Sequence, residues 1–522
     1  MRSQLRAAAV LLAVYALARL ALSFSFSAPV FGWRPADMAS ISLNYARNGF
    51  HFLYPQVAWG GGGPGYVEME FPIVPFLTGI LLEIFRFDDR VFLIIPNLCG
   101  FGIVWLTYRL GVFLFDDDLV AVAAGIMAAV SPPLILLTTT GLWADPPMVL
   151  FASLGIYLAA RWAQGAGARE LWIAVACLSL GILLKLTALY VGIPMLYLVV
   201  KRYGARWWRQ KTTWLAALAI LVPPALWYYH AYRLAAVYHN SFGILSAGST
   251  KFGSLRVMTS WEFYADALKR VALYHFTPLG SVALACGLAV TFRRRASRIL
   301  LVWLSAIVLS GLVAANGVRY GHFAYLLPVL PVGSIYVGVG FRWLLDQLRR
   351  AKVEAGRRRG LPLEATAVAA ACVLFAASTA WADRRFETHD LHNEMLVWTE
   401  RKTTGLLVRE VTRPGSRIIL LDTENNTRTP GSAMVPPDVY YFGDRQGWYL
   451  AVDWASEEKI RSLHESGADY LVVSGESVSA LEVGRRDLYA ALSNDFRVVS
   501  DSQEGVIFDL DAAPSRIRSK TH

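Results

Sequence analysis

Acidic and basic side chains lie at the ends of long apolar segments of this chain. Asp37, Glu68 and Glu70 follow the first apolar run, Asp145 lies at the end of a later run, and Lys185 interrupts a third. Ionisable groups are costly at a membrane boundary, so their presence there indicates a functional site. A carboxylate can take the proton of a bound hydroxyl, and an ammonium group suits a phosphate. These residue types therefore predict transfer of a group from a phosphate to a hydroxyl.

Asp37 precedes an amphipathic stretch, Met38 to Phe50, which we expect to form an interfacial helix. Two interpretations of its carboxylate remain open. It can cap the backbone N–H groups at the start of that helix. Alternatively, it acts as a general base for a hydroxyl held within hydrogen-bond reach.

Glu68 and Glu70 are spaced like alternate residues of a strand. Their oxygens suit a hard divalent cation, with His275 or His239 as a nitrogen ligand, although solvated carboxylates would show the same spacing. A divalent metal ion is therefore the one cofactor that we expect, with Glu68, Glu70 and His275 as its ligands. The run from Gly60 to Gly63 lacks the Lys-Ser/Thr that follows a nucleotide-binding loop, which excludes a nucleotide site.

Further polar groups lie at the ends of later runs. Asp145 precedes two prolines that suit the first turn of a helix, so its carboxylate caps that helix, takes part in catalysis, or does both. Lys185 divides an apolar stretch that is too long for one span; it either extends its ammonium group to water or binds a phosphate. Arg319 can give a phosphate two N–H bonds. We expect Lys185, Arg319 and Tyr320 to bind a donor phosphate.

The composition is that of a polytopic membrane protein. Of 522 residues, 55% are apolar and 17% are charged, whereas soluble domains have roughly 45–50% and about 25%. The net charge of +11 fits basic cytoplasmic loops, and we expect membrane lipids but no nucleic acid as partners. The four cysteines all lie within apolar runs and have no metal-type spacing.

Eleven transmembrane helices are predicted. The segment 72–86 is too short for a span, so we expect an interfacial helix there. A cytoplasmic N-terminus, with an uncleaved first helix, places nearly every dense basic cluster inside. The predicted spans are 8–26, 91–112, 119–139, 146–163, 170–184, 187–200, 213–231, 278–292, 299–315, 323–345 and 364–381.

This topology gives an all-α membrane domain over residues 1–382 and a soluble α/β domain over 383–522 outside the membrane. The first outer loop, 27–90, and the other predicted site residues then lie on the outer side. The outer domain is expected to be structural or to contact an acceptor. Its predicted strands are 416–422, 438–443, 448–453 and 468–474, with a helix over 455–467.

The chain resembles the GT-C superfamily of integral-membrane glycosyltransferases, and more narrowly the bacterial protein-mannosyltransferase-like and aminoarabinose-transferase-like enzymes. No single motif is diagnostic; the order of the matching stretches and their common face are. These stretches are PADMASISLNYARNG, EFPIVPF, ADPPMVLFASLGIYLAARW, LGILLKLTALYVGIPML and RYGHFAYLLPVLP.

The resemblance implies a polyprenyl-phosphate-sugar donor and an inverting transfer. It implies that Asp37 is the catalytic aspartate of the first loop, that Asp145 is a second acidic residue near it, and that Lys185 binds phosphate. Glu70 matches an acid that binds metal in some relatives. Phe71 stands where the aminoarabinose-transferase pattern has lysine, which argues against that sugar and puts metal use in doubt.

We therefore expect an inner-membrane glycosyltransferase that moves one hexose or pentose to a hydroxyl on the periplasmic side, with Asp37 as base and Asp145 as a positioning acid. The acceptor is a protein, a lipid or a polysaccharide of the cell envelope. The alternatives are a transporter or lipid flippase, and a non-catalytic scaffold. Transporters often contain internal repeats and polar groups at the midplane, and this chain shows no convincing repeat.

Overall fold

The computed structural model describes residues 2–22, 29–245, 252–292, 297–319, 323–354, 361–423 and 435–512. Contacts divide the chain into two compact units. The helical unit comprises Met1–Ser27, Leu93–Tyr228 and Gly248–Leu391. The mixed unit comprises Ala28–Phe92, Tyr229–Ala247 and His392–His522, so it joins the first loop to the carboxy-terminal part.

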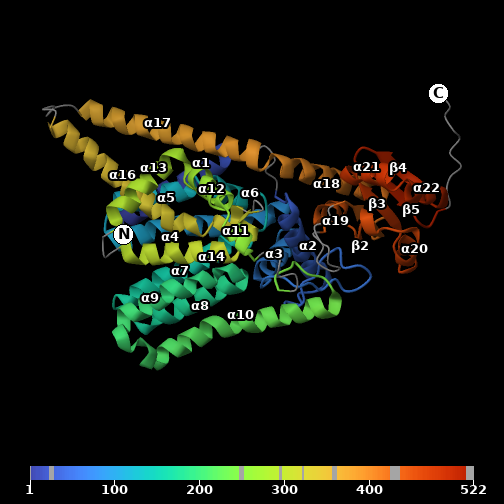
Figure 1. The fold of residues 1–522 in the computed structure, drawn as a ribbon, viewed down its shortest axis with the longest axis horizontal. Helices are drawn as coiled ribbons and strands as arrows, with labels where there is room; N and C mark the ends of the chain where they lie inside the picture. The colour runs from blue at the N-terminus through green and yellow to red at the C-terminus, as the bar shows by residue number, and fades with distance from the viewer. Residues whose placement is uncertain are drawn as a thin grey trace. The chain divides into compact units, whose positions relative to one another are not determined.

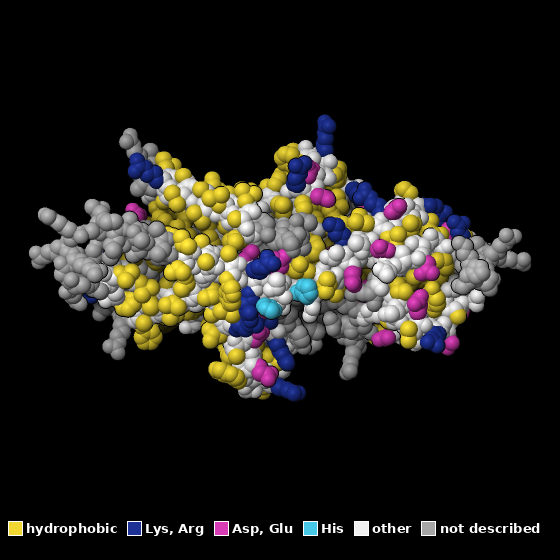
Figure 2. All heavy atoms as spheres, turned by 90° about the horizontal axis from the view of Figure 1, so that it is seen from above, with side chains coloured by type: hydrophobic (Ala, Val, Ile, Leu, Met, Phe, Trp, Pro, Cys, Tyr) yellow, Lys and Arg dark blue, Asp and Glu magenta, His cyan; other side chains and the backbone are white. Residues whose placement is uncertain are grey.

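Every predicted span falls on a helix or on two consecutive helices, which confirms the helical membrane part (Figure 1). Figure 2 shows hydrophobic side chains over much of the visible surface of these helices. The main helices here are α1 (Arg2–Ala21), α4 (Ile94–Phe115), α5 (Asp118–Ala129), α6 (Pro132–Thr139), α7 (Asp145–Ala163), α8 (Ala168–Leu184), η2 (Leu186–Val191), α9 (Gly192–Tyr203), α10 (Lys211–Tyr238), α12 (Trp261–Arg270), η5 (Val271–His275), α13 (Thr277–Thr291), α14 (Arg298–Val313), α15 (Ala315–Arg319), α16 (Val329–Glu354) and α17 (Leu361–Arg385).

The chain is a multi-pass membrane protein by the length and composition of these helices. Four described helices are long and apolar enough to cross a membrane, and two bent pairs raise this number to six. The pair α5 and α6 bends by 54°, and the pair that meets at Phe276 bends by 107°. Pro132 begins α6, and proline cannot continue a preceding helix without loss of a hydrogen bond. The total of eleven spans stays a prediction.

Glycines let α16 approach its neighbours closely. A Cβ added at Gly340 would lie 1.8 Å from the carbonyl oxygen of Ala283 on α13, and one at Gly338 would lie 2.2 Å from that of Val120 on α5. Small residues at such crossings are typical of membrane helix packing. The central helix α16 is thus fixed on two sides by residues without a side chain.

The carboxy-terminal part of the mixed unit is the expected small α/β domain. Its five-stranded sheet has the order β2-β1-β3-β5-β4, with β1 parallel to β2 and β3, and β5 antiparallel to β3 and β4. The strands are β1 (Arg417–Asp422), β2 (Gln446–Ala451), β3 (Tyr470–Ser474), β4 (Arg497–Ser502) and β5 (Gly505–Asp509); the helices are α18 (His392–Val411), α19 (Pro437–Gly443), α20 (Glu457–Glu465), α21 (Gly475–Gly484) and α22 (Arg486–Asp495).

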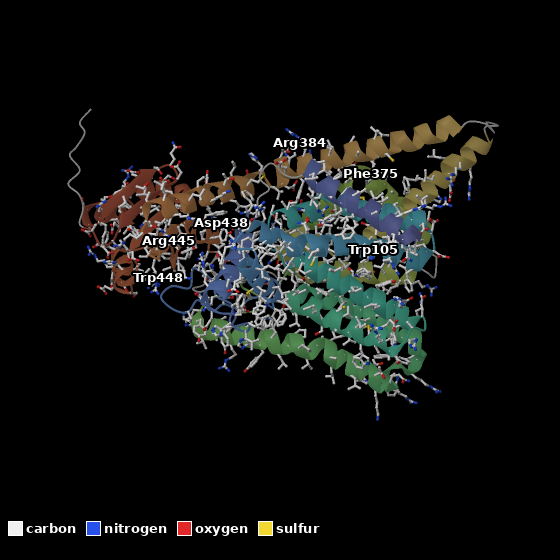
Figure 3. All side chains as sticks on the ribbon, turned by 180° about the vertical axis from the view of Figure 1, so that it is seen from behind. Trp105, Phe375, Arg384, Asp438, Arg445 and Trp448 are labelled. Atoms are coloured by element: carbon white, nitrogen blue, oxygen red, sulfur yellow. The ribbon has the colours of Figure 1, made fainter. Side chains whose placement is uncertain are left out.

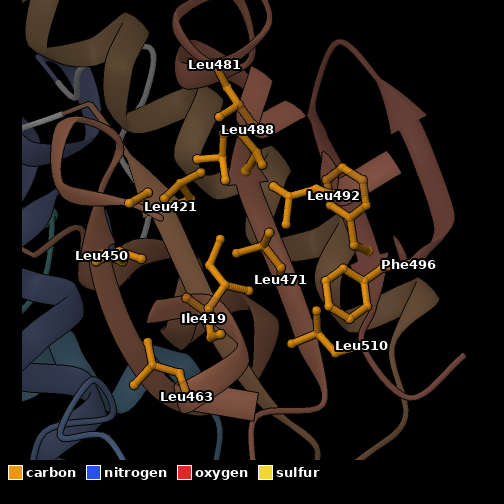
Figure 4. Close-up of a cluster of buried hydrophobic side chains, with 14 of the residues drawn as sticks. Ile419, Leu421, Leu450, Leu463, Leu471, Leu481, Leu488, Leu492, Phe496 and Leu510 are labelled. Atoms are coloured by element: carbon orange, nitrogen blue, oxygen red, sulfur yellow. The ribbon is translucent and has the colours of Figure 1, made fainter. Parts of the chain in front are cut away.

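Apolar side chains pack on one face of this sheet. Ile419 and Leu421 of β1 and Leu471 of β3 meet Leu488 and Leu492 of α22 in a buried cluster (Figure 4). Inward-facing residues alternate along β1, as the period of a strand requires. The predicted strands at 416–422, 448–453 and 468–474 and the helix at 455–467 are confirmed.

The predicted strand at 438–443 is wrong, because this segment is the helix α19. Its valine and aromatic residues favour a strand by propensity. Pro437 at the first helical position and the packing of α19 against α2 and α18 decide otherwise.

The first loop contains the two short helices expected from the sequence, α2 (Trp33–Asn48) and α3 (Ile73–Ile84). Between them the chain is hydrogen-bonded to the edge strand β2 at Gly447. Gly447 N–H donates to Ala58 O at 3.0 Å, and Gly61 N–H donates to Gly447 O at 2.7 Å. Gly61 has a φ of +70°, and an added Cβ would lie 2.8 Å from Trp448 Nε1, so glycine is required there.

Candidate functional site

Asp37 lies inside α2, one turn beyond its start. The residue at the N-cap is Gly32, so the capping interpretation of Asp37 is wrong. The side chain is 1% exposed, and its Oδ1 accepts a hydrogen bond from Trp59 Nε1 at 2.9 Å. Its Oδ2 has no hydrogen-bond partner among the described residues. A buried carboxylate with one unsatisfied oxygen can accept a proton from a ligand.

The surroundings of Asp37 shift the pKa of its carboxyl towards neutral pH. Burial raises the pKa of Asp37 to about 7, and the nearby carboxyls of Asp438 and Glu70 also raise it. The charge of Arg34 and the hydrogen bond from Trp59 lower the pKa of Asp37 and so oppose the effect of burial. A base with a pKa near the working pH is the most effective kind of general base.

Three residues of this site, Trp59, Asp438 and Arg34, were missed by the sequence analysis. Asp438, in the first turn of α19, is 1% exposed (Figure 3). The prolines at 436 and 437 are the signal that could have placed it at the start of a helix. Arg34 lies one turn before Asp37 on α2, and only the helical spacing of three residues could have linked the two.

Glu68 is a buried structural group of the mixed unit. Its Oε1 accepts a hydrogen bond from Leu245 N–H at 2.8 Å, and its Oε2 accepts one from Ser241 Oγ. Its backbone pairs with the same segment, since Glu68 N–H donates to Asn240 O and Phe242 N–H donates to Glu68 O. Glu68 therefore fastens residues 240–245 to the first loop.

The predicted metal site stays a prediction. Glu70 is buried and interacts electrostatically with Asp37. His275 is fully buried at the end of η5, in the helical unit. Across the part of the chain that the structure describes, no group of three His, Cys, Asp or Glu side chains could hold a metal ion.

Asp145 and Lys185 come together in the helical unit. Asp145 is the first residue of α7, and Lys185 follows α8 in an extended conformation. Lys185 Nζ lies 2.6 Å from Asp145 Oδ1, and the side chains are 14% and 4% exposed. The ammonium nitrogen also lies 4.4 Å from the ring centroid of Tyr325. Lys185 does divide the apolar stretch, as predicted, and its ammonium group is held by Asp145.

The remaining predicted phosphate ligands are less well defined. Arg319 is the last residue of α15 and is exposed. Tyr320 lies outside the described residues. The structure thus brings Asp37 and Glu70 together in the mixed unit, and Asp145 and Lys185 together in the helical unit.

Comparison with known proteins shows which family and which solved structures the chain resembles. Residues 69–230 match a family described as dolichyl-phosphate-mannose-protein mannosyltransferase. The crystal structure of ArnT from Cupriavidus metallidurans bound to undecaprenyl phosphate is similar over 97% of each chain, with a TM-score of 0.64 and 14% identity. The archaeal oligosaccharyltransferase AglB from Archaeoglobus fulgidus, in complex with an inhibitory peptide and a dolichol-phosphate, has a TM-score of 0.57 and 13% identity, over 94% of this chain and 72% of its own. No curated protein sequence matches this chain.

The fold is that of the solved ArnT and AglB structures, which agrees with the fold expected from the resemblance to the GT-C superfamily. Within that class, the chain resembles the mannosyltransferase family over residues 69–230 and ArnT over nearly its whole length.

Proposed function

We propose that this protein is an inverting membrane glycosyltransferase that moves one sugar from a polyprenyl-phosphate donor to a hydroxyl acceptor. The observation that carries the proposal is the buried Asp37 carboxyl, whose pKa is near 7 and whose Oδ2 has no partner among the described groups. The undecaprenyl phosphate bound to ArnT and the dolichol-phosphate bound to AglB support a lipid-phosphate donor. The acceptor is a protein, lipid or polysaccharide.

In the proposed step, the acceptor hydroxyl oxygen forms a bond to the anomeric carbon of the sugar and gives its proton to Asp37 Oδ2. The bond from that carbon to the phosphate oxygen breaks, and its electron pair leaves with the polyprenyl phosphate. Lys185, Arg319 and Tyr320 bind the departing phosphate and stabilise its charge. Asp145 holds the Lys185 ammonium in position, at 2.6 Å.

The proposed location is the inner membrane, with a cytoplasmic N-terminus and the α/β domain in the periplasm. This orientation follows from the basic clusters, which it keeps in the cytoplasm. It places Asp37 on the side where no nucleotide donor is available, which agrees with a lipid-linked sugar. The partners are membrane lipids and the donor, and no nucleic acid takes part.

The test is sugar transfer by Asp37→Asn in proteoliposomes with labelled polyprenyl-phosphate sugars and an envelope extract as acceptor. Asparagine keeps the acceptor for Trp59 and cannot take a proton, so we expect transfer to fall by a factor of about 10² to 10⁴. The matched control is Glu83→Gln on α3, an exposed acid of the same loop, which should transfer normally. Full transfer by Asp37→Asn would remove Asp37 from the mechanism, and uptake of substrate without covalent transfer would favour a transporter.

A further inference from the structure

We infer that Arg34 is a specificity-determining residue that binds an anionic group of the acceptor next to its reacting hydroxyl. The inference rests on the proposed function and names the chemical class of its acceptor. Its basis is the arrangement of two buried polar atoms, one donor and one acceptor, on the same helix.

The guanidinium of Arg34 is held in place by aromatic rings. Its Cζ lies 4.5 Å from the ring centroid of Trp33 and 4.5 Å from that of Phe242. Trp33 is itself fixed, because its Nε1 donates to Val435 O at 2.8 Å. Such cation–π contacts hold an arginine without using its N–H donors.

Phe242 is fixed in turn by Glu68. The carboxylate of Glu68 accepts hydrogen bonds from Ser241 Oγ and Leu245 N–H, and its backbone pairs with residues on either side of Ser241. The buried Glu68 therefore positions the ring that holds Arg34. This gives Glu68 a role in the site that needs no metal ion.

One donor group of Arg34, Nη1, has no partner among the residues that the structure describes. This nitrogen is buried, and the same holds for Asp37 Oδ2, which also has no hydrogen-bond partner among the described residues. A buried polar group without a partner destabilises a protein, so such a group marks a place where a water, an ion or a ligand can bind. The two residues are three positions apart on α2, hence on one face of the helix.

The geometry of an inverting transfer decides which substrate Arg34 binds. The base and the leaving phosphate lie on opposite sides of the anomeric carbon. A cation one helical turn from the base is therefore on the acceptor's side. A guanidinium binds carboxylate or phosphate oxygens through two N–H bonds, which makes an anionic acceptor the expected one.

An anion bound at Arg34 would also raise the pKa of the base, Asp37. The positive charge of Arg34 lowers the pKa of Asp37, while Asp438 of α19 and Glu70 raise it and the Trp59 hydrogen bond lowers it. A bound anion neutralises Arg34, so Asp37 becomes a stronger base when the acceptor arrives. The exposed Glu83 is the acidic residue of α3, which also packs on α2.

The experiment measures initial rates of Arg34→Gln in proteoliposomes with a labelled lipid-linked sugar, varying the envelope extract and the donor separately. We expect the half-saturating amount of extract to rise at least tenfold, while the KM for the donor stays within twofold. Inorganic phosphate serves as a probe of the Arg34 site. In the wild type we expect phosphate to inhibit transfer in competition with the extract, and in Arg34→Gln we expect this inhibition to disappear. The acid limb of the pH–rate profile should move to higher pH, because loss of the Arg34 charge raises the pKa of Asp37 and the base form then needs a higher pH.

Two further variants keep the test decisive. Arg34→Lys retains the charge, so the acid limb of its pH–rate profile should stay in place while acceptor binding is still weakened. This variant also provides a test if Arg34→Gln fails to fold. Arg90→Gln, at an exposed arginine of the same unit, should leave every parameter unchanged. A changed donor KM alone, or a glycosylated product without an anion beside its new bond, would overturn the inference. Full activity of Asp37→Asn would instead overturn the proposed function.

Discussion

At the residue scale, Asp37 is a carboxyl whose burial favours its protonated form. The raised pKa of about 7 exceeds the value of about 3.9 in an unfolded chain. Folding therefore takes up a proton between these two values. The stability that this protonated group contributes is complete below about pH 4 and declines as the pH rises to about 7.

This linkage predicts the stability of Asp37→Asn as a function of pH. The neutral amide does not carry the cost of burying a charge, so the variant should unfold at a higher temperature than the wild type. Its advantage should grow from pH 5 to pH 7 and then level off. Thermal unfolding of the purified proteins at pH 5, 6, 7 and 8 measures this, and an advantage that is independent of pH would contradict the raised pKa.

The ion pair of Lys185 and Asp145 allows a second prediction at this scale. Removal of one partner of a buried pair leaves an uncompensated charge, which costs about 3–5 kcal/mol. Lys185→Met and Asp145→Asn should each lower stability strongly, and the double variant should be more stable than either single one. A thermal double-mutant cycle tests this, with additive effects as the contradicting result.

The same double variant separates stability from activity. It should fold and yet fail to transfer sugar, because no ammonium remains for the donor phosphate. Normal transfer by the double variant would show that Lys185 and Asp145 only hold the helical unit together.

The candidate residues themselves were visible in the sequence, but their partners were not. Asp37 and Lys185 could be selected because an ionisable group beside an apolar run is unusual. Arg34 and Asp438 had only local signals, the helical spacing and the prolines, and Trp59 had none, since the fold is what brings the three residues to the carboxyl. The contacts of Glu68 could not be predicted, because two-residue spacing cannot distinguish a metal ligand from a carboxylate bound to Ser241 and Leu245; its role as a metal ligand stays a prediction.

At the element scale, the apolar runs predicted the helices well, because a membrane helix has a strong compositional signal. The break between α5 and α6 is one feature that hydropathy did not show. There the buried Arg19 of α1 donates to Ala129 O at 3.0 Å, a carbonyl at the end of α5, and to Thr138 Oγ1 of α6 at 3.2 Å. Satisfaction of freed backbone groups by a neighbouring helix is what allows a broken helix within a membrane.

The crossing of α16 with α13 gives the prediction at this scale. Gly340→Ala places a methyl group against the backbone of Ala283, and overpacking of this kind costs about 1–3 kcal/mol. We expect a lower thermal midpoint in detergent.

The matched control is Gly311→Ala on α14, where an added Cβ meets no atom within 4 Å. That variant should be neutral or slightly stabilised, since alanine is the better helix former. Equal effects of the two substitutions would contradict the close crossing.

At the scale of the whole molecule, the chain does not divide simply into a membrane part followed by an outer part. The first loop and the carboxy-terminal domain form one compact unit. Ala58 and Gly61 of the first loop form backbone hydrogen bonds with Gly447 of β2, and α19 brings Asp438 to the surroundings of Asp37. The α/β domain thus helps to set the basicity of the candidate base, which composition alone could not indicate.

The central claim is that the base and the phosphate-binding lysine serve one reaction. The most direct measurement is a cryo-EM structure of the protein in lipid nanodiscs with undecaprenyl phosphate. The account predicts the phosphate within hydrogen-bonding distance of Lys185 Nζ. A phosphate bound away from Lys185 would contradict it.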